Sequence, residues 1–232
     1  MAIFKTLQEG LLHLFFPHLC AGCGTDRLHT ASCLCLRCVE AMPETVFERF
    51  PANPVEKTFW GRLPIAAATA QYYFTKESLM QGLLHQLKYK GHRDLGIQLG
   101  KMMGLQLQAS GRFAADALIP LPLFPERERK RGYNQATVLC EGIASVMHLP
   151  VLTRVITRPM YTDTQTLKGR VERWKNIEGK FLLNQPELLS RQRIILVDDV
   201  VTTGATLESC GAELLKAPGV QLSIAALCYT AR

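Results

Sequence analysis

The sequence has no run of about 18 apolar residues, which is the length that a membrane-spanning helix needs. We therefore predict no transmembrane segment. The stretch from Gly10 to Phe16 is apolar, but it is short and leads into Pro17 without the small-residue cleavage site of a secretory signal. Internal repeats and low-complexity segments are also lacking. These absences argue against membrane-spanning, secreted and repeat proteins, and they predict a cytoplasmic protein.

Charged residues are only 20% of the chain, against 47% hydrophobic residues, so a sizeable core is expected. The length of 232 residues accommodates one large α/β domain and a small appendage. Lysine and arginine exceed aspartate and glutamate by seven, and the pI is about 9.1. This balance favours anionic partners such as phosphates or nucleic acid, although a basic surface without such a partner has the same balance.

The eight cysteines are unevenly placed, with five of them between Cys20 and Cys38. Clustering of this kind indicates metal binding in a reducing compartment rather than a disulfide framework. Two Cys-x₂-Cys pairs, Cys20/Cys23 and Cys35/Cys38, supply four thiolates that can surround a structural Zn²⁺ tetrahedrally.

The second pair of ligands has alternatives. Eleven residues separate the two pairs, which is shorter than the usual spacing of about 15–20 in zinc ribbons. Cys33 is an alternative to Cys35, and His18 and His29 are near enough to compete. Buried cysteines without a metal are the remaining interpretation. Zinc content of the purified protein distinguishes a metal site from this last interpretation.

Composition and periodicity divide the chain into four parts. Residues 1–16 have an amphipathic helical pattern with Lys5 as the only basic residue, so we expect a helix that docks on protein rather than on a membrane surface. Residues 17–42 form the cysteine module, and 43–60, which contain proline and glutamate and lack a period, are predicted as a linker. Residues 61–232 form the larger domain.

Strand-like and helix-like patterns alternate in the larger domain, which predicts a doubly wound parallel α/β sheet. Strands are expected at 65–74, 117–123, 151–156, 194–197 and 222–229, and helices at 77–89, 94–108, 135–147 and 207–216. Cys210 and Cys228 fall in these elements and are interpreted as small core residues.

Residues 193–206 contain several candidate ligand-binding residues in one stretch. A continuous apolar run from Ile194 to Val197 is typical of a strand buried on both faces, and Asp198 and Asp199 follow at its carboxyl end, where α/β sheets bind ligands. A turn rich in glycine and hydroxyls then precedes a helix, and such a turn can cradle a phosphate. Acids beside an anion cradle suit a sugar phosphate, with Mg²⁺ between them.

Residues 193–206 resemble the signature with which type I phosphoribosyltransferases bind phosphoribosyl pyrophosphate (PRPP). The resemblance implies that Asp198 and Asp199 hold the ribose hydroxyls directly or through Mg²⁺, and that the next residues bind the 5′-phosphate. Those residues are Val201, Thr202, Thr203, Gly204, Ala205 and Thr206. The alternative is a buried strand, an acidic turn and a capped helix, which occur in any doubly wound protein.

A basic turn follows the expected strand at 117–123. Gly132 and Asn134 permit unusual backbone angles there, and a second anion site is predicted. Its residues would be Arg129, Lys130, Arg131 and Gly132, in the pyrophosphate-loop region. An exposed charged turn is the alternative.

Residues 164–176 are polar and basic, with about the length of an active-site lid. Because phosphoribosyltransferases carry their mobile catalytic loop at this place, the resemblance implies that Lys168, Arg170 or Arg173 neutralises departing pyrophosphate. An ordinary amphipathic helix running through Trp174 is the alternative.

Taken together, the cysteine pairs, the residues Arg131-Gly-Tyr-Asn-Gln135 and the acidic pair resemble the ComF/GntX family over residues 17–230. The resemblance implies a zinc module followed by a phosphoribosyltransferase-like domain, and partners in natural transformation, namely single-stranded DNA and the DNA-uptake machinery. A nucleotide-salvage phosphoribosyltransferase with an added zinc module is the alternative. The sequence does not identify an acceptor for the ribosyl group.

Overall fold

The computed structural model of the chain describes residues 18–28, 32–158 and 181–231. The helix expected at 1–16 lies outside the described residues, as does the expected lid at 164–176 with Lys168 and Arg170.

A four-stranded parallel sheet in the order β1-β6-β5-β2 forms the centre of the larger domain. The strands are β1 (Ala67–Tyr73), β2 (Ala117–Pro120), β5 (Arg193–Val201) and β6 (Gln221–Tyr229). Strand β5 lies inside the sheet, between β6 and β2, because its apolar run from Ile194 to Val197 is at most 1% exposed and needs cover on both faces.

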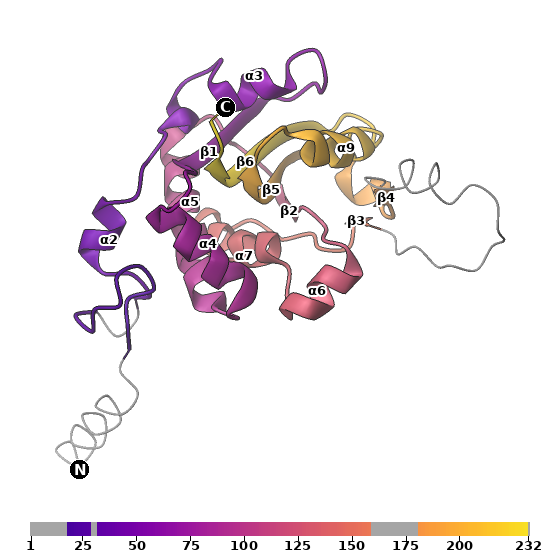
Figure 1. The fold of residues 1–232 in the computed structure, drawn as a ribbon. Coiled ribbons are helices and arrows are strands. Elements are labelled where there is room, and N and C mark those ends of the chain that lie inside the picture. The colour runs from indigo at the N-terminus through magenta and orange to yellow at the C-terminus, as the bar shows by residue number, and fades with distance from the viewer. Residues whose placement is uncertain (1–17, 29–31, 159–180, 232) are drawn as a thin grey trace, which may run out of the picture.

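Helices cover both faces of this sheet (Figure 1). Helices α4 (Leu79–Tyr89), α5 (Arg93–Ser110) and α7 (Gln135–Met147) pack on one face. Helices α3 (Pro54–Phe59) and α9 (Ala205–Leu214) pack on the other. The predicted doubly wound parallel α/β architecture is therefore confirmed.

Helices α5 and α7 approach each other closely through glycines. A methyl group added at Gly100 would lie 2.2 Å from the carbonyl oxygen of Leu139, and one at Gly142 would lie 2.3 Å from that of Ile97. These glycines let the two backbones touch, so the helices form one layer in which α7 lies against β5 and β2 and α5 against β6.

Two segments differ from the sequence-based expectation. Only Val151 of the strand expected at 151–156 pairs with the main sheet, through a single parallel bridge to Leu118. The chain then turns at the exposed Thr153 and Arg154, and β3 (Ile156–Thr157) pairs antiparallel with β4 (Leu182–Leu183) in a separate small sheet. The basic turn at 125–132 is helix α6 (Pro125–Arg131), with acids in its first turn and bases in its last, as the helix dipole favours.

The expected linker at 43–60 contains packed structure. It carries the 3-10 helix η1 (Phe47–Arg49) and helix α3, and its side chains Val55 and Phe59 are fully buried. Asn53 caps α3 with its oxygen and donates through its amide nitrogen to the Ala68 carbonyl of β1. The domain boundary stays a prediction, and η1 and α3 pack with the larger domain.

The cysteine module lies beside α4 and α5. Its residue Leu34 is 3% exposed and belongs to the same buried cluster as Leu83 of α4. Gln98 of α5 accepts a hydrogen bond from the Cys33 backbone at 2.6 Å, and Gln86 of α4 donates to the Ala21 carbonyl. In the described ranges no helix is both long enough and apolar enough to cross a membrane.

Candidate functional sites

The first site is the cluster of four thiols from the two Cys-x₂-Cys pairs. The sulfur atoms of Cys20, Cys23, Cys35 and Cys38 all lie within 4.8 Å of one another, and those of Cys23 and Cys35 are 3.6 Å apart. Sulfurs at about 2.3 Å from a tetrahedral Zn²⁺ are about 3.8 Å apart, so the donor set fits a metal such as zinc. The predicted four-cysteine cluster is confirmed, and Cys35 rather than Cys33 completes it.

Local folding prepares this cluster for a cation. Cys35 is the N-cap of helix α2 (Leu36–Glu40), which presents Cys38 one turn later. Burial opposes ionisation of Cys20, but hydrogen bonds from the backbone of Cys23, Cys35 and Gly22 outweigh it and lower its thiol pKa to about 6. Burial and the neighbouring thiols raise the pKa of Cys38. Without a cation, therefore, Cys20 and Cys38 do not ionise together.

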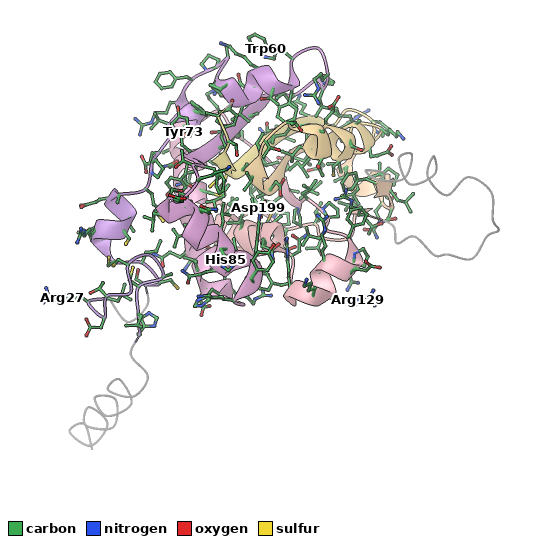
Figure 2. All side chains as sticks on the ribbon, viewed as in Figure 1. Arg27, Trp60, Tyr73, His85, Arg129 and Asp199 are labelled. Atoms are coloured by element: carbon green, nitrogen blue, oxygen red, sulfur yellow. The ribbon has the colours of Figure 1, made fainter. Side chains whose placement is uncertain are left out.

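The second site lies at the carboxyl edge of the main sheet, where β5 carries the acidic pair. Asp198 and Asp199 are adjacent in the strand, so their side chains leave opposite faces of the sheet. Asp199 pairs with Lys88 near the end of α4, with Nζ and Oδ2 at 2.8 Å. Asp198 accepts a hydrogen bond from the Asp199 backbone at 2.7 Å. The labelled side chain of Asp199 lies near the middle of the molecule in Figure 2, above His85 of α4.

The two carboxylates have different electrostatic surroundings. Burial, followed by the charge of Asp199, raises the pKa of Asp198 well above its usual range. The Asp199 N–H and the cations Lys88 and Arg158 act in the opposite direction. Burial raises the pKa of Cys210 in α9 and of Cys228 in β6; the charge of Asp198 adds to the shift of Cys210, and that of Asp199 adds to the shift of Cys228. The acids therefore face separate neighbours at one edge of the sheet.

The loop after the acids begins helix α9. Thr202 and Thr203 are exposed, and Gly204 is the left-handed N-cap of the helix with φ +74°. A side chain is strained in this conformation, so glycine suits the position. The turn, with the helix amino terminus behind it, has the form of the predicted phosphate cradle.

The basic residues reach the same edge from β2 by way of α6. Gly132 ends α6 with φ +82°, a left-handed conformation that requires the backbone freedom predicted for this glycine. Asn134 has an ordinary backbone and instead caps α7, accepting from the Ala136 N–H at 3.0 Å. Arg131 lies over the ring of Tyr89 with its Cζ 5.6 Å from the centroid, so α6 adjoins the end of α4 that carries Lys88. Arg129 projects from α6 at the rim of the molecule (Figure 2).

Three cations near this edge were not among the predicted site residues. The first is Lys88 in the last turn of α4. Arg158 stacks on Phe124, with its Cζ 3.6 Å from the ring centroid, and on Phe181 at 5.2 Å. Its position just after an expected strand was the available signal. Arg62 contacts Thr203 across 141 positions of sequence, and no local pattern indicates that.

Fold and sites together define the class: a doubly wound parallel α/β protein with a four-cysteine cluster suited to a metal. No protein-family model matches the chain. The chain is 28% identical over 216 residues to DNA utilization protein YhgH of Escherichia coli O157:H7, covering 91% of this chain and 84% of the relative. It is 27% identical over 212 residues to competence protein F of Haemophilus influenzae, covering 89% and 81%.

A third homologue is competence protein ComFC of Bacillus subtilis, which is 27% identical over 149 residues that cover 62% of this chain and 56% of that protein. The chain is thus a homologue of the YhgH, competence protein F and ComFC proteins, which confirms the resemblance predicted from its motifs.

Solved structures show partial likeness. The glutamine PRPP amidotransferase of B. subtilis has a TM-score of 0.40 and 17% identity, covering 60% of this chain and 30% of its own. A hypothetical protein of Neisseria gonorrhoeae with bound ppGpp has a TM-score of 0.39 and 17% identity, covering 60% and 69%. Superpositions at this level carry no conclusion about ligands.

Proposed function

We propose that this protein is a competence-type, phosphoribosyltransferase-like protein that binds PRPP with Mg²⁺ and serves the handling of single-stranded DNA in natural transformation. One structural observation supports PRPP as the ligand. An acidic pair, a glycine-containing loop at a helix amino terminus and a group of cations meet at one edge of a parallel sheet. This combination suits a ligand with hydroxyls, a phosphate and a pyrophosphate.

Each part of the ligand has a proposed partner. Thr202 to Thr206 would bind the 5′-phosphate, and Asp198 and Asp199 the ribose hydroxyls, directly or through Mg²⁺, which prefers oxygen ligands. The pyrophosphate would lie on the side of Lys88 and of α6, whose proposed contacts are Arg129, Lys130, Arg131 and Gly132. Because Lys88 already pairs with Asp199, the anionic ligand would share this cation with the acid. Lys168 and Arg170 remain proposed pyrophosphate contacts outside the described residues.

Titration calorimetry tests the ligand. PRPP with Mg²⁺ should bind more tightly than either ribose 5-phosphate or pyrophosphate alone, because each fragment reaches only part of the site. Absence of binding heat with PRPP, at concentrations up to millimolar and at two temperatures, would rule the proposal out.

A reaction requires more than the ligand. In a transfer, a lone pair of the acceptor forms a bond to the ribose C1′ while the C1′–O bond breaks and pyrophosphate leaves with the electron pair. Cations such as Lys88 would stabilise that leaving group. Pyrophosphate release measured over a panel of bases and nucleotides distinguishes a salvage enzyme, which turns over with one free base, from a binding protein.

The role in DNA handling has its own support. The relatives are named for DNA utilization and competence. Tyr89 is 60% exposed between the ring of His85, at 5.0 Å, and the guanidinium of Arg131. Exposed aromatic rings among cations are typical of surfaces that bind single strands.

Salt dependence tests this surface. Affinity for a labelled single strand should fall steeply with salt, and Arg129→Ala/Arg131→Ala should flatten the slope of log affinity against log salt by about 1.4 when both cations contact phosphates. Lys216→Ala, which changes a cation just after α9 that is paired with Glu213, is the control. A wild-type affinity that does not change with salt would contradict a DNA-binding role.

A further inference from the structure

Arg62 lies in the turn after α3 and contacts the loop that follows the acidic pair. Its Nη1 donates to the carbonyl oxygens of Thr203 and Thr58, both at 3.1 Å. Its Nη2 pairs with the carboxylate of Glu208 in the first turn of α9. One guanidinium therefore joins α3, the loop and α9.

Side chains of α3 and of the turn after it also pack closely against the loop and α9. A methyl group added at Gly204 would lie 2.8 Å from Thr58 Cγ2 and 3.0 Å from the ring of Phe59. Further along α9, one at Gly211 would lie 2.7 Å from Leu63 Cδ2. The inner side of the loop therefore rests on α3.

Charge gives Arg62 a second role. Glu208 lies one turn into α9, close to the helix amino terminus where a phosphate would bind. An unpaired carboxylate there would repel a dianion, and the ion pair with Arg62 compensates that charge. Holding the Thr203 carbonyl also turns this acceptor toward α3 and away from the exposed side of the loop.

We propose that Arg62 is a positioning residue that shapes the 202–206 loop for a phosphate monoester by holding the Thr203 carbonyl and neutralising Glu208. This inference rests on the proposed function, since it assigns the monoester end of the sugar phosphate to that loop. Arg62 itself touches no ligand in this account.

Calorimetry with ribose 5-phosphate and with pyrophosphate, each with Mg²⁺, tests the proposal. Arg62→Ala should weaken ribose 5-phosphate binding by roughly tenfold, the low end of the loss found when a residue that orients a metal ligand is removed. Pyrophosphate, which uses the α4 and α6 side, should bind as to the wild type. Adding Glu208→Gln to Arg62→Ala should restore part of the ribose 5-phosphate affinity, because the uncompensated charge is removed.

Arg193→Ala is the matched control. Arg193 is also an exposed arginine paired with a carboxylate, Asp116 at 2.7 Å, but it begins β5 at the opposite edge of the sheet. Its substitution should leave both affinities unchanged.

The outcomes separate the two proposals. If the wild type binds ribose 5-phosphate and Arg62→Ala binds it equally well, the role of Arg62 is wrong and the PRPP site stands. If the wild type binds neither PRPP nor ribose 5-phosphate, the proposed function fails. The role of Arg62 then rests on amide hydrogen exchange of residues 203–206 in the ligand-free protein, which should be faster in Arg62→Ala; unchanged exchange would overturn it.

Discussion

Replacing Cys38 by serine is expected to release the metal from the four-cysteine cluster and to detach the cysteine module from α4. Cys38 is 5% exposed, and its sulfur is one of the four that face one another. A structural Zn²⁺ contributes on the order of 10 kcal/mol to the folding of a small module at neutral pH. The buried side chains that the module adds to the core around α4, which are Cys20, Leu34, Cys38 and Met42, would lose the support of the metal.

Cys33→Ser is the matched control for this prediction. Cys33 lies in the same module, but burial and Asp94 raise its thiol pKa, and it is not one of the four clustered cysteines. Metal analysis should give about one equivalent of zinc for the wild type and for Cys33→Ser, and little for Cys38→Ser. Less than about half an equivalent of zinc in freshly prepared wild type would contradict the metal site. Loss of zinc in Cys33→Ser but not in Cys38→Ser would show that Cys33 is the fourth ligand.

Changing both acids, as Asp198→Asn/Asp199→Asn, is expected to abolish PRPP binding at millimolar concentrations. Both changes remove a full charge from the place where hydroxyls or Mg²⁺ would be held. The two single variants should affect the site differently, because the two acids face different neighbours. Asp199→Asn leaves Lys88 without its partner, whereas Asp198→Asn keeps an oxygen that can accept the Asp199 backbone hydrogen bond.

Stability shows whether such a loss of binding reflects unfolding. The pKa of Asp198 is raised in the folded state by burial and by Asp199, so this group favours folding at low pH. That contribution is complete below the pKa of an unfolded aspartate, about 3.9, and is lost as pH rises through the folded value. Asp198→Asn should therefore melt at the same or a higher temperature than the wild type at pH 7, with a smaller decrease in stability between acid and neutral pH. A clear loss of stability at pH 7 would contradict this assignment.

The sequence predicts the β5 region well because several local signals agree there. The apolar run at 194–197 predicts a buried strand and the glycine at 204 predicts a turn, and the structure has both, although the strand ends only at Val201, after the two acids. The cysteine pairs were equally predictable, since two Cys-x₂-Cys spacings almost dictate a four-thiol cluster.

Contacts between distant segments explain what the sequence could not show. Residues 43–60 lack a period because they form a short 3-10 helix and a single capped helix, each too short to show one. The strand expected at 151–156 has the right composition, but the main sheet accepts only Val151 before the chain leaves it. Lys88 and Arg158 reach the acids from other elements, and such convergence is a property of the fold.

The opposite orientation of the two acidic side chains was also not predicted from the sequence. Adjacent carboxylates suggest a single chelating pair, yet neighbours in a strand point to opposite faces. Asp198 and Asp199 obey that rule because β5 continues as a strand to Val201, so the turn begins only after both acids.

The carboxyl edge around Asp198 and Asp199 is the proposed binding site for PRPP. Titration of PRPP with Mg²⁺ into the wild type and into Asp198→Asn/Asp199→Asn, side by side at pH 7, tests it most directly. We expect saturable binding to the wild type and none to the double variant, with both proteins folded. Equal affinity of the two proteins would contradict it.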